Sequence, residues 1–248
     1  MPTIANPEDV PIYGRCGRIG AVIPANNSVI EPEWWSVMPR NVALYATRIL
    51  ARGDLTTEAV LRMESDVDRA VDELAATGVD VIAYCDMVTT FIMKNGWNEA
   101  KVAEIALRTG AAAVSAWTAL RDALSVLKVR RFALGTPYPA EIHALVPDFF
   151  TAQGYGIVDH ATLDILKMKD VSKVSGKRLA QFVEGLCRDG ADAVVLLATD
   201  LPSFTSIAEL ERRSGLPVLT SNQTILWRAL RMIGNEVRVA NLGRLFHV

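Results

Sequence analysis

The stretch Gly78-Val79-Asp80-Val81-Ile82 returns with similar residues as Gly190-Ala191-Asp192-Ala193-Val194, 112 residues further along the chain. Two more pairs of segments repeat in the same order and at similar offsets: Arg18-Ile19 to Pro24 with Arg131-Phe132 to Pro137, and Arg108-Thr109-Gly110 with Arg213-Ser214-Gly215. Each match alone is weak, because glycine and aspartate often precede a strand in α/β proteins. Together, the three matches favour a duplicated α/β lobe.

Short apolar runs alternate with helical patterns between and around these repeats. This alternation is typical of parallel sheets covered by helices, so the fold class is α/β. Helices are predicted over 56–76 and 173–188. We expect two pseudo-symmetric lobes, residues 1–115 and 116–221, with the first closed by a C-terminal helix over 222–248. The strands are predicted at 18–23, 42–46, 79–84, 112–115, 131–135, 193–197 and 216–220.

Composition excludes several classes of protein. The 248 residues carry a formal net charge of −2 and are 50% hydrophobic, which argues against disorder and against a nucleic-acid partner. No apolar run is long enough for a membrane span, and the proline-containing start of the chain, Met1–Tyr13, does not look like a secretory signal. Three cysteines without metal-type spacing indicate reduced thiols and a cytoplasmic location.

Parallel strands place their carboxyl ends at one edge of a sheet, where α/β proteins bind ligands. Two lobes related by a pseudo-two-fold axis would turn these edges toward one crevice. The segments expected there contain no lysine or arginine, and such a crevice binds a carboxylate through backbone N–H groups and hydroxyls. These segments are 24–33, 85–91, 136–139, 198–204 and 220–223.

The same segments resemble the aspartate/glutamate racemase superfamily, in the branch that contains maleate cis-trans isomerase and arylmalonate decarboxylase. The resemblance covers nearly the whole chain, in order. The segments that carry it are Pro24-Ala25-Asn26-Asn27-Ser28 with Glu31-Pro32-Glu33, Tyr84-Cys85-Asp86-Met87-Val88-Thr89-Thr90-Phe91, Thr136-Pro137-Tyr138, Ala198-Thr199-Asp200-Leu201-Pro202, and Ser221-Asn222-Gln223 with Trp227.

The resemblance implies two flavodoxin-like lobes and chemistry without a metal or organic cofactor. It implies an isomerase or racemase that acts at the α-carbon of a small dicarboxylic acid. The alternatives are an arylmalonate-type decarboxylase, and a catalytically impaired dicarboxylate binder or repurposed hydrolase. The family often forms homodimers, and Trp34, Trp35 and Trp97 are candidate exposed anchors.

The resemblance also implies two catalytic cysteines, one in each lobe, and the sequence departs from the family at both positions. The position of the first cysteine is occupied by Asp86, and Cys85 lies one residue before it. Neighbouring strand residues point to opposite faces, so only one of the two is expected to face the crevice. Asp86 is either a proton-transfer group or a helix cap. The second position falls on Ala198 or, in another alignment, on Thr199. Ala198 is either a natural loss or an introduced replacement.

The remaining candidates are substrate-binding residues: Asn26, Asn27, Thr136, Tyr138 and Asn222. Their amides and hydroxyls could donate to a substrate carboxylate, although asparagines also serve ordinary turns. Cys187 is expected in the core of its helix. The histidines 143, 160 and 247 show no ligand spacing, so no metal site is expected.

Overall fold

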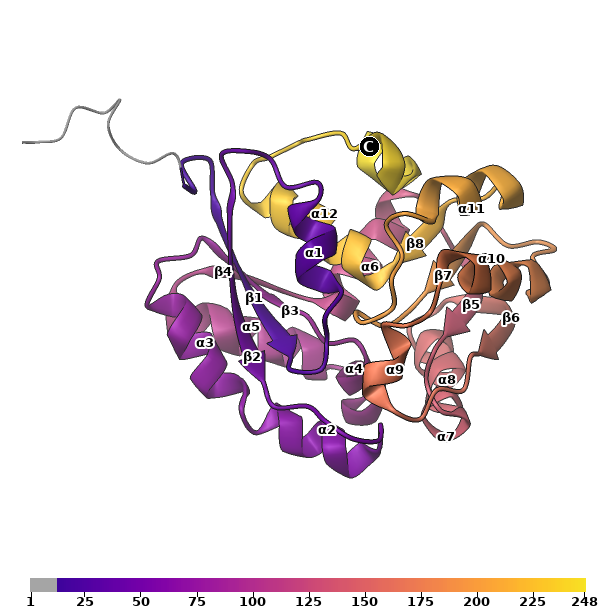
Figure 1. The fold of residues 1–248 in the computed structure, drawn as a ribbon, viewed down its shortest axis with the longest axis horizontal. Coiled ribbons are helices and arrows are strands. Elements are labelled where there is room, and N and C mark those ends of the chain that lie inside the picture. Colours follow the sequence, from indigo (N-terminus) through magenta and orange to yellow (C-terminus); the bar gives the residue numbers. More distant parts are fainter. Residues whose placement is uncertain (1–12) are drawn as a thin grey trace, which may run out of the picture.

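A computed structural model describes residues 13–248, so the expectation about a secretory signal concerns residues that lie mostly outside this range. The described chain contains two four-stranded parallel sheets with helices around them (Figure 1). In spatial order, the first sheet consists of β2 (Ala43–Ile49), β1 (Arg18–Pro24), β3 (Val81–Tyr84) and β4 (Ala112–Ser115). The second consists of β6 (Gly156–Thr162), β5 (Arg131–Thr136), β7 (Ala193–Leu196) and β8 (Val218–Thr220).

The two sheets have the same strand order, as the sequence repeat predicts. Asp80 accepts a hydrogen bond from the Arg18 N–H at the start of β1, and Asp192 accepts one from the Arg131 N–H at the start of β5. Gly78 and Gly190 have φ angles of +69° and +74°, which side chains rarely adopt. The repeated Gly-x-Asp segment therefore does the same work in both lobes: it turns the chain and holds the start of the first strand.

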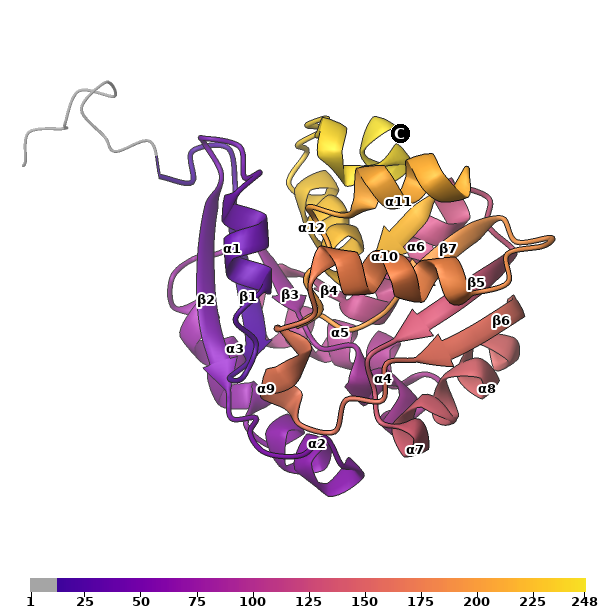
Figure 2. The ribbon, with the colours of Figure 1, turned by 45° about the vertical axis from the view of Figure 1, so that its right-hand side comes forward.

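Helices flank both sheets and also lie between them (Figure 2). Helix α6 follows β4 and α12 follows β8, and the two helices pack against each other. Helix α12 also contacts β3 and β4, so a helix that follows the second sheet closes the first one. The helices are α1 (Ile30–Trp35), α2 (Thr57–Glu64), α3 (Val67–Ala75), α4 (Val88–Met93), α5 (Trp97–Thr109), α6 (Ala116–Val126), α7 (Ala140–His143), α8 (Leu145–Ala152), α9 (Met168–Val171), α10 (Gly176–Gly185), α11 (Ile207–Ser214) and α12 (Ser221–Met232).

The helix predicted over 56–76 is in fact two helices, α2 and α3. Its predicted cap is confirmed, because the Thr56 hydroxyl accepts the Ala59 N–H. The break falls at Ser65 and Asp66. The Ser65 hydroxyl donates to the Arg62 carbonyl, and the Asp66 carboxylate accepts the Leu50 N–H and pairs with Arg69. Short polar side chains of this kind compete with helical backbone bonds.

Three other expectations need correction. The 173–188 helix is α10 alone, so Cys187 lies beyond its end, exposed and not in the core. The C-terminal helix ends at Met232 and is followed by two 3-10 turns, Ala240–Leu242 and Arg244–His247. Strand β6 was missed, because this half-buried edge strand carries Asp159 and His160 instead of an apolar run.

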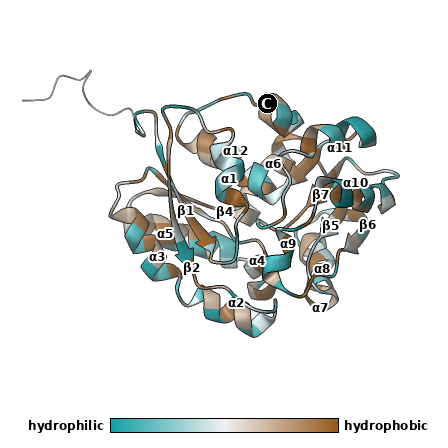
Figure 3. Ribbon diagram, viewed as in Figure 1, coloured by the Kyte–Doolittle hydropathy of each residue, from teal (hydrophilic) through white to brown (hydrophobic). Residues whose placement is uncertain are grey.

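The inner strands form the core. Strand β3 is buried along its whole length, and so is β7. Figure 3 shows hydrophilic colour on the outer helices α3, α10 and α11 and hydrophobic colour on inner strands such as β1. No helix in the described part of the chain is long and apolar enough to cross a membrane.

Candidate active site

A small cavity lies between the two sheets, beyond the carboxyl ends of their strands. Its volume is about 40 Å³. Four of the five segments expected at the crevice contribute to it, and the fifth, 220–223, does not. Its lining residues are Pro24, Asn26, Asn27, Ala51, Leu55, Val60, Met63, Asp86, Met87, Val88, Tyr138, Met168, Val171, Ala198, Thr199 and Asp200.

The Asp86 carboxyl group lines this cavity and also caps a helix. Its Oδ1 accepts the Thr89 N–H at 2.8 Å, in the first turn of α4. Asp86 is only 5% exposed, and burial raises its pKa above the ordinary value, although hydrogen bonds from Thr89 oppose the shift. The carboxyl group is therefore positioned by the helix while it remains part of the cavity wall.

Cys85 does not line the cavity. The residue is fully buried, and its Sγ lies 3.4 Å from the Ala83 carbonyl oxygen. Burial raises the pKa of the Cys85 thiol well above its ordinary value, and the nearby charges of Asp86 and Glu31 raise it further. The thiol thus stays protonated, whereas a cysteine nucleophile must be a thiolate.

Thr199 links the two lobes at the cavity. Its hydroxyl donates to the Cys85 carbonyl oxygen at 3.0 Å and accepts the Asn27 side-chain N–H at 3.1 Å. The Asn27 Oδ1 accepts the N–H groups of Val29 and Ile30 at the start of α1. The predicted site residues Asn27 and Thr199 both line the cavity. Their polar atoms, however, already form hydrogen bonds to each other, to the Cys85 carbonyl and to the start of α1.

Ala198 occupies the cavity wall with an unusual backbone conformation. The residue is 5% exposed and has a φ of +91°, which is unfavourable for any residue with a Cβ. Such backbone strain costs on the order of 1 kcal/mol or more and tends to occur at functional sites. No thiol stands at this position in the second lobe.

Asp200 is a cavity residue that the sequence analysis missed. Its Oδ2 accepts the Asn26 side-chain N–H at 3.3 Å. Burial raises the pKa of Asp200 to about 7, and the charge of Asp86 contributes to the rise. The available signal was an acid at the carboxyl end of a strand, in a segment without lysine or arginine.

Tyr138 presents a buried hydroxyl to the same cavity. The residue is 3% exposed, and its hydroxyl has no hydrogen-bond partner among the described residues. Burial raises the pKa of Tyr138 well above its ordinary value, and the charges of Asp86 and Asp200 add to this, so the group remains a donor. An unpaired buried donor is costly, so this hydroxyl is available to an oxygen of a molecule in the cavity.

Two predicted binding residues lie outside the cavity. The Thr136 hydroxyl is 2.9 Å from His143 Nδ1, and His143 Nε2 is in turn 2.9 Å from His160 Nδ1. Asn222 donates its side-chain N–H to Glu33 at 2.7 Å. The Thr136 hydroxyl and the Asn222 side-chain N–H are therefore engaged within the protein, away from the cavity wall. His143 ends helix α7 and His160 lies on strand β6, so the tertiary fold brings the two histidines together, which sequence spacing did not show.

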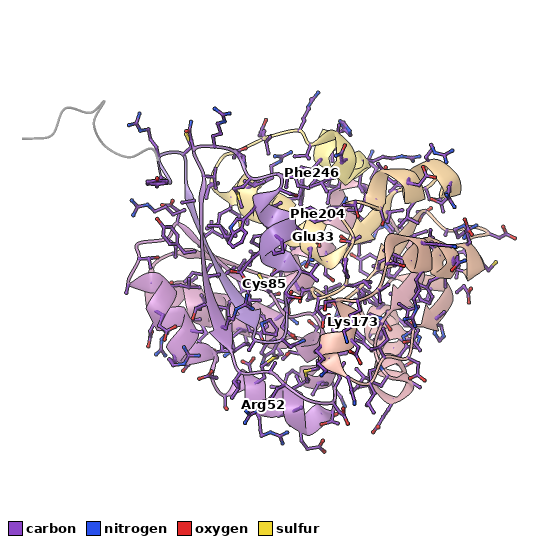
Figure 4. The ribbon with its side chains drawn as sticks, viewed as in Figure 1. Glu33, Arg52, Cys85, Lys173, Phe204 and Phe246 are labelled. Carbon is purple, nitrogen blue, oxygen red and sulfur yellow. The ribbon has the colours of Figure 1, made fainter. Side chains whose placement is uncertain are left out.

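Glu33 forms a second connection between the lobes. Its carboxylate accepts the backbone N–H groups of Ser203 and Phe204 as well as the amide of Asn222. Figure 4 shows Glu33 on α1 next to Phe204. Burial raises the pKa of Glu33, and these hydrogen bonds oppose the shift. The sequence signal, a glutamate in a short helix, was too general to predict this contact.

Behind Asp86, a polar network leads away from the cavity. The Tyr84 hydroxyl donates to Glu64 at 2.7 Å and lies 3.4 Å from the Thr89 hydroxyl. Lys101 pairs with Glu64 at 3.2 Å. Since Thr89 also donates its backbone N–H to Asp86, this network fixes the residues around the carboxyl group.

The rest of the cavity wall is apolar, and no lysine, arginine or histidine belongs to it. The apolar side chains come from α2 and α9 and from the loops around them: Ala51, Leu55, Val60, Met63, Met168 and Val171. Within residues 13–248, no group of three or more histidine, cysteine or acidic side chains could hold a metal ion. The arrangement offers one acid–base pair of carboxyl groups beside a hydroxyl donor and an apolar wall.

Curated relatives cover almost the whole chain. Maleate isomerase of Geobacillus stearothermophilus is 28% identical over 241 residues, which are 92% of this chain and 96% of that protein. Arylmalonate decarboxylase of Bordetella bronchiseptica is 25% identical over 236 residues, covering 92% and 95%. The named relatives are thus maleate isomerases, with arylmalonate decarboxylase as a related branch.

Solved structures of maleate isomerases are similar to this fold along almost the whole chain. A mutant of Nocardia farcinica maleate cis-trans isomerase with a covalently bound succinylcysteine intermediate has a TM-score of 0.87 at 28% identity, covering 93% of this chain and 98% of that one. A maleate isomerase from Pseudomonas putida S16 with maleate has a TM-score of 0.86 at 24% identity, covering 93% and 97%, and supports the fold. The family model described as arylmalonate decarboxylase matches residues 19–246, and this chain therefore belongs to that family.

Proposed function

We propose that this chain is a cofactor-independent isomerase or racemase that acts at the α-carbon of a small dicarboxylic acid, with the Asp86 carboxyl group in place of a thiol. The observation that carries the proposal is that Asp86 and the unpaired Tyr138 hydroxyl line one buried cavity between the sheets. The named relatives, which are maleate isomerases, support the reaction type.

For a substrate with a saturated α-carbon, such as aspartate, the ionised Asp86 carboxylate removes the α-proton in the proposed reaction. The C–H bond breaks, an O–H bond forms on Asp86, and the electron pair moves into the substrate carboxylate as an enediolate. Tyr138 donates a hydrogen bond to the enediolate oxygen, which stabilises the developing charge. Return of this proton by Asp86 gives exchange only. For racemisation, protonated Asp200 delivers a proton to the opposite face of the α-carbon, and solvent carries the proton from Asp86 back to Asp200.

For maleate, the Asp86 carboxylate adds to the C=C bond: an O–C bond forms while the electron pair enters the distal carboxylate, the new C–C single bond rotates, and release of Asp86 restores the C=C bond in the trans form. The raised pKa of Asp86 makes it a stronger base than an exposed aspartate.

A second candidate, decarboxylation, is favoured by the apolar wall. A substrate carboxylate that faces Leu55, Val60 and Met168 loses its hydration, which favours its release as CO₂. The C–C bond breaks, the electrons enter the remaining carboxylate, and protonated Asp86 delivers one proton to the α-carbon. This reaction needs a proton donor on one face only, which suits a site with Ala198 in the second lobe.

The test is to incubate the protein with maleate, aspartate and an α-arylmalonate in D₂O and to follow each acid by NMR. Isomerisation or α-deuterium incorporation supports the first candidate, and CO₂ release from the malonate supports the second. Binding by calorimetry without either reaction identifies a dicarboxylate binder. No reaction and no binding contradict both candidates.

The proposal extends to the surroundings of the enzyme. The proposed lobe boundary lies near residue 115, and the three free cysteines suit the reducing cytoplasm.

A homodimer is also proposed, but fewer of the three candidate tryptophans are exposed enough to contact a second subunit. Trp34 is fully buried, and Trp97 packs against Tyr84, whereas Trp35 is 61% exposed. Light scattering at micromolar concentration should give a mass near twice 27.1 kDa, and a mass of 27.1 kDa would contradict the dimer.

A further inference from the structure

The central cavity offers no cation to a second carboxylate. Its volume is about 40 Å³. The cavity already holds the carboxyl groups of Asp86 and Asp200, and no cation belongs to its wall. A second substrate carboxylate inside it would be repelled by both acids. The charges of the cavity therefore suit one carboxylate at the reacting end of the substrate better than two.

A larger hollow of about 400 Å³ adjoins this cavity and shares Asn26 and Ala51 with it. Its other lining residues are mostly charged: Arg52, Gly53, Asp54, Lys167 and Lys169. The cavity and the hollow therefore border each other at Asn26 and Ala51. The walls of the hollow have the opposite charge to a carboxylate, apart from Asp54.

The three cations of the hollow are exposed. In the described part of the chain, no ion pair joins Arg52, Lys167 or Lys169 to an acid, although the charges of Lys167 and Lys169 also lower the pKa of the neighbouring Asp170. The nearby Asp170 pairs with Lys173 at 2.7 Å. The hollow therefore keeps a net positive charge, whereas the protein as a whole carries −2.

The cations come from both lobes, and backbone hydrogen bonds hold them side by side. The Leu55 N–H donates to the Leu166 carbonyl at 2.8 Å, and the Met168 N–H donates to the Gly53 carbonyl at 3.2 Å. Figures 1 and 2 both place α9 between the lobes, next to α2, and Figure 4 shows Arg52 at the same edge. These backbone hydrogen bonds thus join the two segments that carry the cations of the hollow.

We propose that this hollow binds a second carboxylate of the substrate, one that lies several bonds from the reacting α-carbon. The substrate class is therefore an extended dicarboxylic acid, with its α-carbon at Asp86 and its distal carboxylate beside Arg52, Lys167 and Lys169. This inference rests on the proposed function, because that function places the α-carbon at Asp86.

Calorimetry with succinate, glutarate, adipate and pimelate, each compared with the monocarboxylate of equal chain length, tests the inference. We expect the wild type to prefer the longer diacids over their monoacids. The triple variant Arg52→Gln/Lys167→Gln/Lys169→Gln should lose this preference by at least about tenfold, because each partly solvated charge pair contributes about two- to fivefold. Added salt should reduce the wild-type preference.

The matched control is Lys177→Gln, an exposed lysine on α10 outside the hollow, which should leave the preference unchanged. Equal loss of diacid binding in Lys177→Gln, or an unchanged preference in the triple variant, would overturn the inference. If monoacids bind and exchange their α-protons while diacids bind no more tightly than monoacids, the hollow does not bind a second carboxylate and the proposed function is unaffected. If no acid binds to any variant, both fail.

Discussion

The Thr199 hydroxyl donates to the Cys85 carbonyl oxygen at 3.0 Å, and this bond joins the ends of two strands that belong to different sheets. Because Asp86 follows Cys85 and Ala198 precedes Thr199, the bond sets how the two halves of the cavity face each other. Thr199, which takes the position of the second family cysteine in one alignment, therefore connects the two lobes.

Replacing Thr199 by valine should separate the lobes at this point. The buried Cys85 carbonyl and the Asn27 amide would each lose a partner, so we expect the free energy of unfolding to fall by about 1–3 kcal/mol. Urea titration measures the change. Thr199→Ser keeps the hydroxyl and should lose less than half as much; an equal loss in both variants would contradict the role of the hydroxyl.

Tyr138→Phe should affect binding and stability in opposite directions. The hydroxyl is buried without a partner, so its removal should leave the melting temperature unchanged or raise it. A hydrogen bond to a charged carboxylate is worth about 1.5–3 kcal/mol, so the affinity for a carboxylate ligand should fall roughly tenfold or more. Calorimetry and thermal unfolding on the same samples give both values. A fall in stability with unchanged affinity would mean that the hydroxyl serves the fold.

Asp200→Asn should stabilise the protein more at high pH than at low pH. The folded-state pKa of about 7 lies above the ordinary value of 3.8, so the folded state binds more protons than the unfolded state between these values. The free energy of unfolding therefore decreases as the pH rises from about 4 to about 7. We expect a gain of roughly 1–3 kcal/mol at about pH 8.5 and a smaller one at about pH 4.5, measured by urea titration. An equal gain at both pH values would contradict the raised pKa.

Much of the fold follows from the sequence, because the Gly-x-Asp segment occurs twice with the same role. Asp80 accepts the N–H at the start of a strand 62 residues earlier and Asp192 does the same 61 residues earlier, so the repetition leaves a readable pattern. Strand β6 leaves no such pattern in the sequence, since a half-buried edge strand has no continuous apolar run. The break between α2 and α3 depends on side-chain bonds of Ser65 and Asp66 that periodicity does not reveal.

The candidate site was predicted less completely, because its arrangement depends on contacts between residues far apart in the chain. The strand ends indicated the segments of the crevice, and the family resemblance indicated Asp86, Ala198 and Tyr138 within them. Neither revealed that Thr136 and Asn222 bond within the protein, or that Asp200 turns into the cavity. Those outcomes depend on the partners that packing supplies.

The central claim is that the Asp86 carboxyl group, and not the Cys85 thiol, transfers the proton at the α-carbon. The most direct measurement is the rate of α-deuterium exchange, followed by NMR, of an acid that the wild type exchanges. Asp86→Asn, which keeps the size of the side chain, should lower the rate by at least about 100-fold. Cys85→Ala should leave the rate within about twofold, since a buried, protonated thiol takes no part. The opposite pattern, with exchange retained in Asp86→Asn and lost in folded Cys85→Ala, would contradict the account.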